Sequence, residues 1–166
     1  MTFDYTSSFY IGGYWATKVA DRLQDSGINC YAPPINIAQN NQEREHMTLH
    51  EQDIVLSWTH HPIEVKSSSR DFTENIIDYP YETLFVDTVH GYDSKKIKPL
   101  AYVIVSQKSD AMVCISPRSS NNWERVNRFD HQREISDWFY SAPKSSLIPF
   151  NALVEHLQVQ QKEATI

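Results

Sequence analysis

The chain has 166 residues, 40% of them hydrophobic, and a formal net charge of −6 at pH 7. This length suits one domain with a buried core, so we expect residues 1–166 to form a single domain. The sequence has no run of 18 apolar residues and no basic stretch followed by an apolar one near its beginning. We therefore expect neither a membrane span nor a secretory signal, and no membrane partner.

The cysteines and the charge distribution bear on location and partners. Cys30 and Cys114 lie in unrelated apolar stretches, which predicts buried thiols and a reducing, cytoplasmic location. Residues 1–64 contain eight acids and three bases, a balance of −5, whereas residues 95–133 contain eight bases and three acids, a balance of +5. Basic side chains supply most non-specific affinity for nucleic acids, so the second stretch indicates either a DNA-binding surface or an ordinary solvated one.

The first predicted element is a helix over residues 14–26, where apolar residues recur at helical spacing and Gly27 is a natural stop. Gly12 and Gly13 lack the lysine of a phosphate-binding loop, and we interpret them as a flexible approach to this helix. A short strand is expected over residues 28–32, followed by a polar loop. Further metal ligands could come from this loop and its continuation, although each of these side chains fits a solvated position better: Glu43, Glu45, His46, His50 and Glu51.

Two strand-like runs, residues 51–58 and residues 63–66, flank a His-His-Pro turn, which is the pattern of a β-hairpin. Side chains alternate along a strand, so Glu64 and Lys66 point to one face. A neighbouring strand would bring Asp53 to them. Two carboxylates suit Mg²⁺, and a lysine beside that ion can orient or deprotonate a water or neutralise charge on a phosphate.

The order of Asp53, a turn and then Glu64-x-Lys66 with a hydrophobic x resembles the PD-(D/E)xK nuclease superfamily, which has the restriction-endonuclease-like fold. The resemblance covers residues 51–69 closely and the strand pattern as far as Ser116 more loosely. Two features depart from the family. Gln52 replaces proline before the first acid, and no glutamate precedes residue 43, although many members carry one on the first helix.

This resemblance implies an α/β domain in which a mixed central β-sheet is flanked by helices. It also implies a metal-dependent endonuclease that hydrolyses DNA with Mg²⁺, or with Mn²⁺ as a substitute. Asp53, Glu64 and the Val65 carbonyl would bind the ion, and Lys66 would position the attacking water or stabilise the pentavalent state. DNA contacts are expected from seven residues: Ser68, Arg70, Lys95, Lys96, Arg118, Arg125 and Arg128.

Three alternatives stay open from the sequence. A structure-specific junction resolvase would use the same site and form a symmetric homodimer. A non-catalytic DNA-binding or assembly protein would bind without cutting. Glu64 and Lys66 could also be a same-face ion pair on an exposed edge strand, which typically contributes about 0–1 kcal/mol and has no chemical role.

The remaining elements complete the α/β pattern. A short helix is expected at residues 72–77, a strand at residues 83–89 with Asp87 inside it, and a hairpin formed by residues 102–106 and 111–116. Residues 121–133 mix arginines with Trp123 and Phe129, which fits either base stacking or closure of the core. Two further helices are predicted, a short one from the spacing of Ile135, Trp138 and Phe139 and one that begins at Pro149, with residues 158–166 as a flexible tail.

Overall fold

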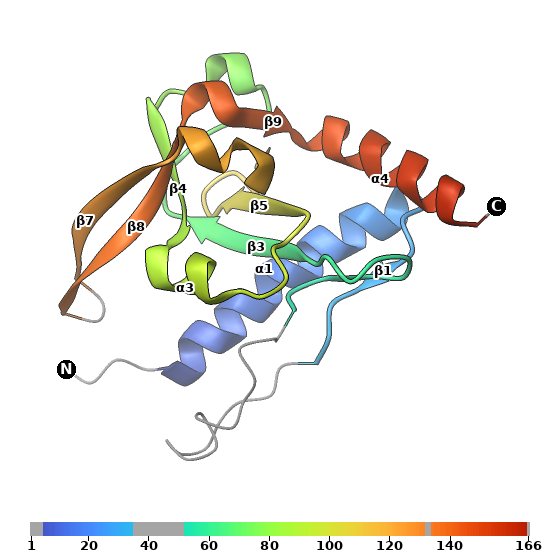
Figure 1. The fold of residues 1–166 in the computed structure, drawn as a ribbon, viewed down its shortest axis with the longest axis horizontal. Coiled ribbons are helices and arrows are strands. Elements are labelled where there is room, and N and C mark those ends of the chain that lie inside the picture. Colours follow the sequence, from blue (N-terminus) through green and yellow to red (C-terminus); the bar gives the residue numbers. More distant parts are fainter. Residues whose placement is uncertain (1–4, 35–51, 132–133, 166) are drawn as a thin grey trace.

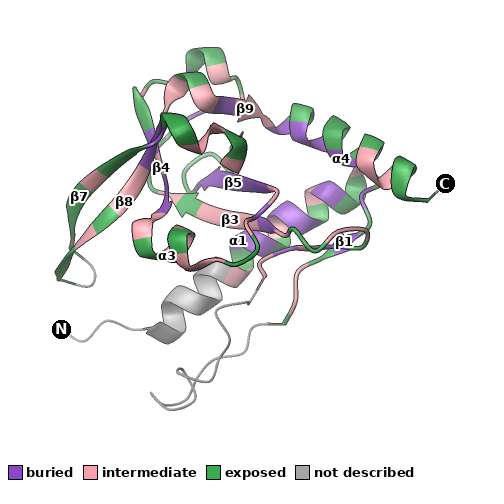
Figure 2. Ribbon diagram, in the orientation of Figure 1, coloured by how far each residue is buried: buried purple, intermediate pink, exposed green. Residues whose placement is uncertain are grey.

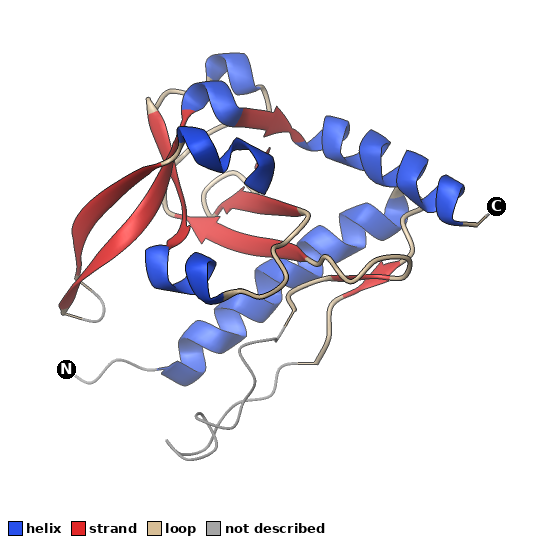
Figure 3. Cartoon of the chain, in the orientation of Figure 1, coloured by secondary structure: helices blue, strands red, loops and turns tan. Residues whose placement is uncertain are grey.

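A computed structural model describes residues 5–34, 52–131 and 134–165, with the side chains of the first helix from residue 13 onward. The chain is a mixed α/β protein, as predicted, and its strands and helices are drawn in Figures 1 and 3. The helices are α1 (Tyr5–Asp25), α3 (Val89–Ser94) and α4 (Phe150–Ala164), with 3-10 helices η1 (Ile76–Asp78), η2 (Pro117–Asn122) and η3 (Lys144–Ser146). The strands are β1 (Cys30–Tyr31), β2 (Val55–Leu56), β3 (Ile63–Ser68), β4 (Thr83–Thr88), β5 (Ala101–Ser106), β6 (Met112–Ile115), β7 (Glu124–Asp130), β8 (Ile135–Pro143) and β9 (Leu147–Pro149).

Helix α1 ends as its sequence predicts. Gly27 adopts a φ of 82°, which costs a glycine little, and its N–H donates to the Gln24 carbonyl at 2.9 Å. The N–H of Ile28 donates to the Leu23 carbonyl at 3.0 Å, which completes a Schellman motif. At its other end the helix begins earlier than predicted, so Gly12 and Gly13 lie inside α1 and do not form a flexible approach to it.

The central sheet has four strands in the order β3-β5-β6-β9. Strands β3 and β5 run parallel, whereas β5, β6 and β9 pair antiparallel, so the sheet is mixed. Strand β3 occupies one edge. The predicted hairpin before it is reduced to a single antiparallel bridge between Ile54 and Ile63, and β2 pairs with β1 in a small sheet of its own.

Each face of the central sheet is covered by a different layer. Helices α1 and α4 cover one face, where a core forms around Leu23, Val103 and Leu157. The other face packs against a three-stranded antiparallel sheet in the order β4-β8-β7, around Val86, Tyr102 and Ile104. Figure 2 shows β5 buried between these layers, whereas β7 and the adjoining part of β8 are largely exposed. The second sheet was not predicted. Helices α1 and α4 flank the first face, whereas the short helix α3 lies with the second sheet and packs Tyr92 against its core.

Two predicted helices are wrong. Residues 135–139 begin β8, because this segment pairs on one side with β4 and on the other with β7, and its Phe139 ring packs on Phe85 at 5.5 Å between centroids. These cross-strand contacts outweigh the helical spacing of its apolar residues. In residues 72–77 only the turn η1 forms, because the Asn75 side chain caps it by accepting from the N–H of Ile77.

The predicted tail is also wrong up to Ala164, because α4 continues to that residue. Gln158 and Gln161 each donate a side-chain hydrogen bond, at 2.9 Å, to the carbonyls of Ser26 and Gly27 at the end of α1. These bonds hold the second half of α4 against the first helix. Among the described residues, no helix is both long and apolar enough to cross a membrane.

The docking of α4 predicts a difference between two aliphatic positions on it. Leu157 is fully buried in the first core, whereas Val159 is 55% exposed. Leu157→Ala should lower the free energy of unfolding by about 2–5 kcal/mol, because it removes buried methyl groups and leaves a cavity. Val159→Ala should change it by less than about 0.5 kcal/mol. Urea unfolding followed by circular dichroism measures both, and equal effects would contradict the docking of this helix.

Candidate active site

The candidate site lies on β3, at the edge of the central sheet. Alternation along the strand directs Ile63 and Val65 towards the core under α1, and Glu64 and Lys66 towards the opposite face. On the neighbouring strand, Glu64 lies in register with Tyr102. The predicted same-face arrangement of the glutamate and the lysine is therefore confirmed.

Asp53 lies beside β3 because Ile54, the next residue, forms the bridge to Ile63. Its carboxylate Oδ2 accepts a hydrogen bond from the backbone N–H of Val65 at 2.8 Å. The N–H and C=O of one strand residue point to the same edge, so the Val65 carbonyl is also directed to the side on which Asp53 lies. Asp53 therefore contacts the strand between Glu64 and Lys66.

Two lysines share two carboxylates at this position. The Lys66 ammonium lies 2.8 Å from Glu64 Oε1 and 3.3 Å from Asp87 Oδ1. The Lys95 ammonium lies 2.8 Å from Asp87 Oδ2 and 3.3 Å from Glu64 Oε2, and it also donates to the Gly91 carbonyl at 3.1 Å. Each carboxylate thus contacts both ammonium groups. We call Glu64, Lys66, Asp87 and Lys95 the charge cluster.

The charge cluster is attached to the core by Asp87 and Tyr102. Asp87 is an 8% exposed residue of β4, so it brings a carboxylate from the second sheet to a strand of the first. The fully buried Tyr102 donates its hydroxyl to Asp87 Oδ2 at 2.8 Å. Burial, together with the adjacent Glu64 and Asp87 carboxylates, raises the pKa of Tyr102, so its hydroxyl stays a donor at neutral pH.

The ionisation of the cluster follows from its pairing. Burial opposes charge on Lys66, but Glu64 and Asp87 outweigh it and raise the pKa of the lysine. Burial likewise opposes charge on Asp87, but Lys66, Lys95 and the Tyr102 hydroxyl outweigh it and lower the pKa of this acid. The lysine and the aspartate therefore both remain charged at neutral pH.

Asp53 differs from the cluster acids. Burial is the largest influence on it and, together with the nearby Glu64 charge, raises the pKa of Asp53 to about 6. The hydrogen bond from Val65 and the charges of Lys66 and Lys95 oppose this rise only in part. A carboxyl group with a pKa near neutrality in a polar cluster is a common property of functional sites, although structural ion-pair networks also perturb pKa values.

The oxygen donors at this position suit only some metal ions. Within the described ranges, no group of three or more His, Cys, Asp or Glu side chains is arranged to hold a metal. Asp53, Glu64 and the Val65 carbonyl instead offer two carboxylates and one carbonyl, all oxygen donors. This sparse set fits Mg²⁺, which retains several waters, better than it fits an ion that needs a closed protein cage. In the arrangement seen, the ammonium of Lys95 neutralises the Glu64 carboxylate that such an ion would need.

The structure gives several predicted DNA-binding residues other contacts. Lys95 belongs to the charge cluster. The Arg70 guanidinium donates to the Thr83 carbonyl at 2.7 Å and lies over the Tyr81 ring at 4.5 Å, so it holds the end of β3 against the beginning of β4. The Ser68 hydroxyl accepts from the Arg70 backbone N–H at 3.2 Å. All three side chains thus already have hydrogen-bond or ion-pair partners within the protein.

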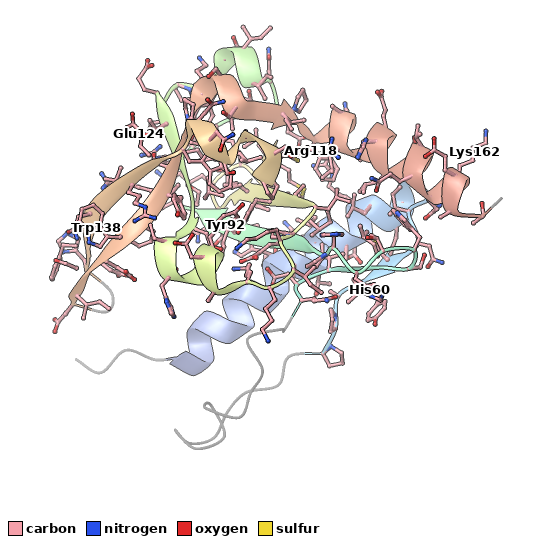
Figure 4. All side chains as sticks on the ribbon, in the orientation of Figure 1. His60, Tyr92, Arg118, Glu124, Trp138 and Lys162 are labelled. Carbon is pink, nitrogen blue, oxygen red and sulfur yellow. The ribbon has the colours of Figure 1, made fainter. Side chains whose placement is uncertain are left out.

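The other predicted basic residues lie on three segments of the chain. Lys96 is exposed, and Arg118 lies on η2, as Figure 4 shows. Arg125 and Arg128 are on β7, where the Arg125 guanidinium lies 3.8 Å from Asp93 and that of Arg128 lies 4.7 Å from the centroid of the Phe85 ring. Of the predicted basic residues, Lys95 is thus the one that the structure pairs with Glu64 of the candidate site.

Tyr102 is the described contributor to the site that the sequence did not indicate, because it reads as a core aromatic. Asp87 gave a signal, an acid within an apolar strand, but its distance from β3 could not be derived. Lys95 was expected to contact DNA and instead contacts Glu64 and Asp87. The candidate ligands beyond the described part of the chain are Glu43, Glu45, His46, His50 and Glu51.

No family model, curated protein or solved structure matches this chain.

The raised pKa of Asp53 predicts that this residue lowers stability at neutral pH. A carboxyl group whose folded pKa exceeds its unfolded value favours folding below the unfolded pKa and loses that contribution as the pH rises through 6. Asp53→Asn keeps an oxygen to accept from Val65, so it should stabilise the metal-free protein by about 1–3 kcal/mol at pH 8 and have little effect below pH 4. Denaturant unfolding at several pH values in chelator measures this.

Asp21→Asn is the control for this prediction. Asp21 is exposed on α1, and its substitution should leave stability unchanged across the same pH range. An Asp53→Asn variant that is no more stable at pH 8 than the natural protein would contradict the raised pKa.

Proposed function

We propose that this protein is a metal-dependent nuclease of the restriction-endonuclease-like class that hydrolyses DNA phosphodiester bonds at the edge of β3. One observation carries the proposal. Asp53 hydrogen-bonds to the backbone of Val65, between Glu64 and Lys66, and these side chains lie close enough to influence the pKa of Asp53. An acid beside β3 thus meets a second acid and a lysine on that strand, in the order of the family motif.

Asp53, Glu64 and the Val65 carbonyl would hold Mg²⁺ or Mn²⁺. When bound, the ion would supply charge neutralisation at the phosphate and an activated water. The protein would contribute the position of its two carboxylates, which β3 and the bridge between Ile54 and Ile63 fix relative to each other. Preorganised groups of this kind lower a barrier because they need not rearrange during the reaction.

Lys66 would stabilise negative charge and orient the attacking water. Its contacts with Glu64 and Asp87 raise its pKa, so it stays protonated at neutral pH and is a poor base. Charge stabilisation is therefore favoured over proton abstraction for this residue. Asp87 and Tyr102 would be positioning residues, since the first holds Lys66 and the second holds the carboxylate of the first.

A non-catalytic DNA-binding protein is the second candidate, and one observation favours it. Lys66 and Lys95 together neutralise Glu64 and Asp87, which is also what a purely structural ion-pair network does. Such a protein would bind DNA equally well with and without metal and would cut none. Incubation with supercoiled, linear, single-stranded and branched DNA, in Mg²⁺, Mn²⁺ or chelator, separates the two candidates.

Lys66→Ala tests the catalytic assignment. It should reduce metal-dependent cleavage by at least about a hundredfold, because it removes the cation that stabilises charge on the phosphate. Folding and DNA binding should stay nearly intact, since Lys95 still contacts both carboxylates. Plasmid cleavage, a mobility-shift assay and thermal unfolding measure the three properties. Undiminished cleavage by this variant would contradict the role, and Lys162→Ala, at an exposed lysine of α4 that is not among the expected DNA contacts, is the matched control.

Lys95 should compete with the metal ion for Glu64. Removing its charge in Lys95→Met should therefore lower the Kd for Mn²⁺ by at least about tenfold, whereas Glu64→Gln should raise it. Isothermal titration calorimetry without DNA measures both constants. Lys96→Met provides the same change of charge on an exposed side chain and should leave the Kd unchanged. Tighter binding after that control substitution as well would show a general charge effect and would contradict the competition.

A further inference from the structure

A cavity of about 760 Å³ lies away from the charge cluster, between the beginning of β5, the helix η2 and the first turns of α4. Its volume falls within the range of about 300–1,000 Å³ that is usual for small-molecule sites. Leu100, Ile148 and Leu153 provide an apolar floor. Figure 4 shows Arg118, another lining residue, on η2 close to the beginning of α4.

The charge of this cavity is opposite to that of the whole chain. The described lining includes His61, Lys98, Arg118 and His156, and none of the described residues that line it is an aspartate or a glutamate. This is unusual for a sequence with 21 acids and a net charge of −6. A concave surface with bases and without acids attracts anions.

The basic groups differ in their availability. The Arg118 guanidinium has no hydrogen bond or ion pair within the described part of the chain, whereas its backbone N–H donates to Ser116 Oγ at 3.2 Å. His61 Nδ1 donates to the Lys98 carbonyl at 2.9 Å, so in the neutral ring its Nε2 is an acceptor and a poor partner for an anion. The Lys98 ammonium itself is occupied by the carbonyl and ring of Tyr92. Arg118 is therefore the main candidate for binding an anion.

An apolar floor beside an available guanidinium suits an anion with a flat apolar body. We propose that the cavity is a nucleotide subsite that receives one nucleotide unit, with the base on the floor and the phosphate at Arg118 and His156. The choice of a nucleotide among organic anions rests on the proposed function. Residues 95–100 also connect the two sites, since Lys95 belongs to the charge cluster and Leu100 lines the cavity.

Calorimetric titration in chelator tests this subsite without any metal or cleavage. The probes are deoxyadenosine monophosphate, deoxyadenosine, inorganic phosphate and a short single-stranded oligonucleotide. The monophosphate should bind at least about tenfold more tightly than either the nucleoside or phosphate alone, because it engages both the floor and the guanidinium. If the oligonucleotide binds more tightly than the monophosphate, the bound nucleotide belongs to a nucleic-acid strand. If the two bind equally, the ligand is a free nucleotide.

Three variants locate the binding. Arg118→Ala should weaken the monophosphate about tenfold or more. Ala152→Glu should do the same, since it adds a carboxylate to the lining at an exposed position of α4. Asn151→Glu makes a similar change at the adjacent exposed residue, which is not among the lining residues, and should bind normally.

The outcomes separate this inference from the nuclease proposal. Absence of nucleotide binding, or binding that Arg118→Ala and Ala152→Glu leave unchanged, would overturn the subsite whether or not the protein cuts DNA. The protein could also bind nucleotide, lose that binding in both variants and yet cut no DNA under any metal condition. This result would support the subsite and overturn the nuclease proposal. Lys66→Ala should retain full nucleotide binding, because Lys66 lies outside the cavity.

Discussion

The sharing of the Glu64 and Asp87 carboxylates between Lys66 and Lys95 is the interaction on which the rest of the site depends. It joins a strand of the central sheet to a strand of the second sheet, at a place where both acids are largely shielded from water. The two negative and two positive charges balance. A buried charge without compensation is costly in a protein interior, and here each carboxylate keeps one ammonium partner if the other is removed. The pairing therefore fixes both the layers and the position of the lysine.

The stability of the protein and the chemistry proposed for it make opposite demands at this place. Tyr102 and Asp87 are satisfied, since the hydroxyl donates to the carboxylate and both lysines pair with it. The hydrogen bond from Val65 and the charges of Lys66 and Lys95 compensate the buried Asp53 carboxylate only in part. Its pKa of about 6 records the cost of burying a carboxylate beside another acid. In the proposed function, a bound cation would neutralise the Asp53 carboxylate and so offset that cost.

The charge cluster and the cavity differ in kind and are joined by one short segment. The cluster is compact and internally neutral, whereas the cavity has an apolar floor and a basic lining. Residues 95–100 contribute Lys95 to the first and Leu100 to the second. Lys98 is held by Tyr92 of α3, which also packs against Trp123 at 5.1 Å between ring centroids. Residues 95–100 would thus link the proposed cleavage site to the proposed nucleotide subsite.

Several local features of this protein follow from short sequence patterns. Alternation placed Glu64 and Lys66 on one face of a strand, glycine chemistry ended α1 at Gly27, and a residue pattern gave the hairpin of β5 and β6. Contacts between distant segments bring Asp87 and Lys95 together, place residues 135–139 in a strand and engage Arg70 within the protein, and none of this could be read from a local pattern. The reason is physical: periodicity and capping act over a few residues, whereas these outcomes depend on pairing between segments distant in the chain, whose register no local pattern records.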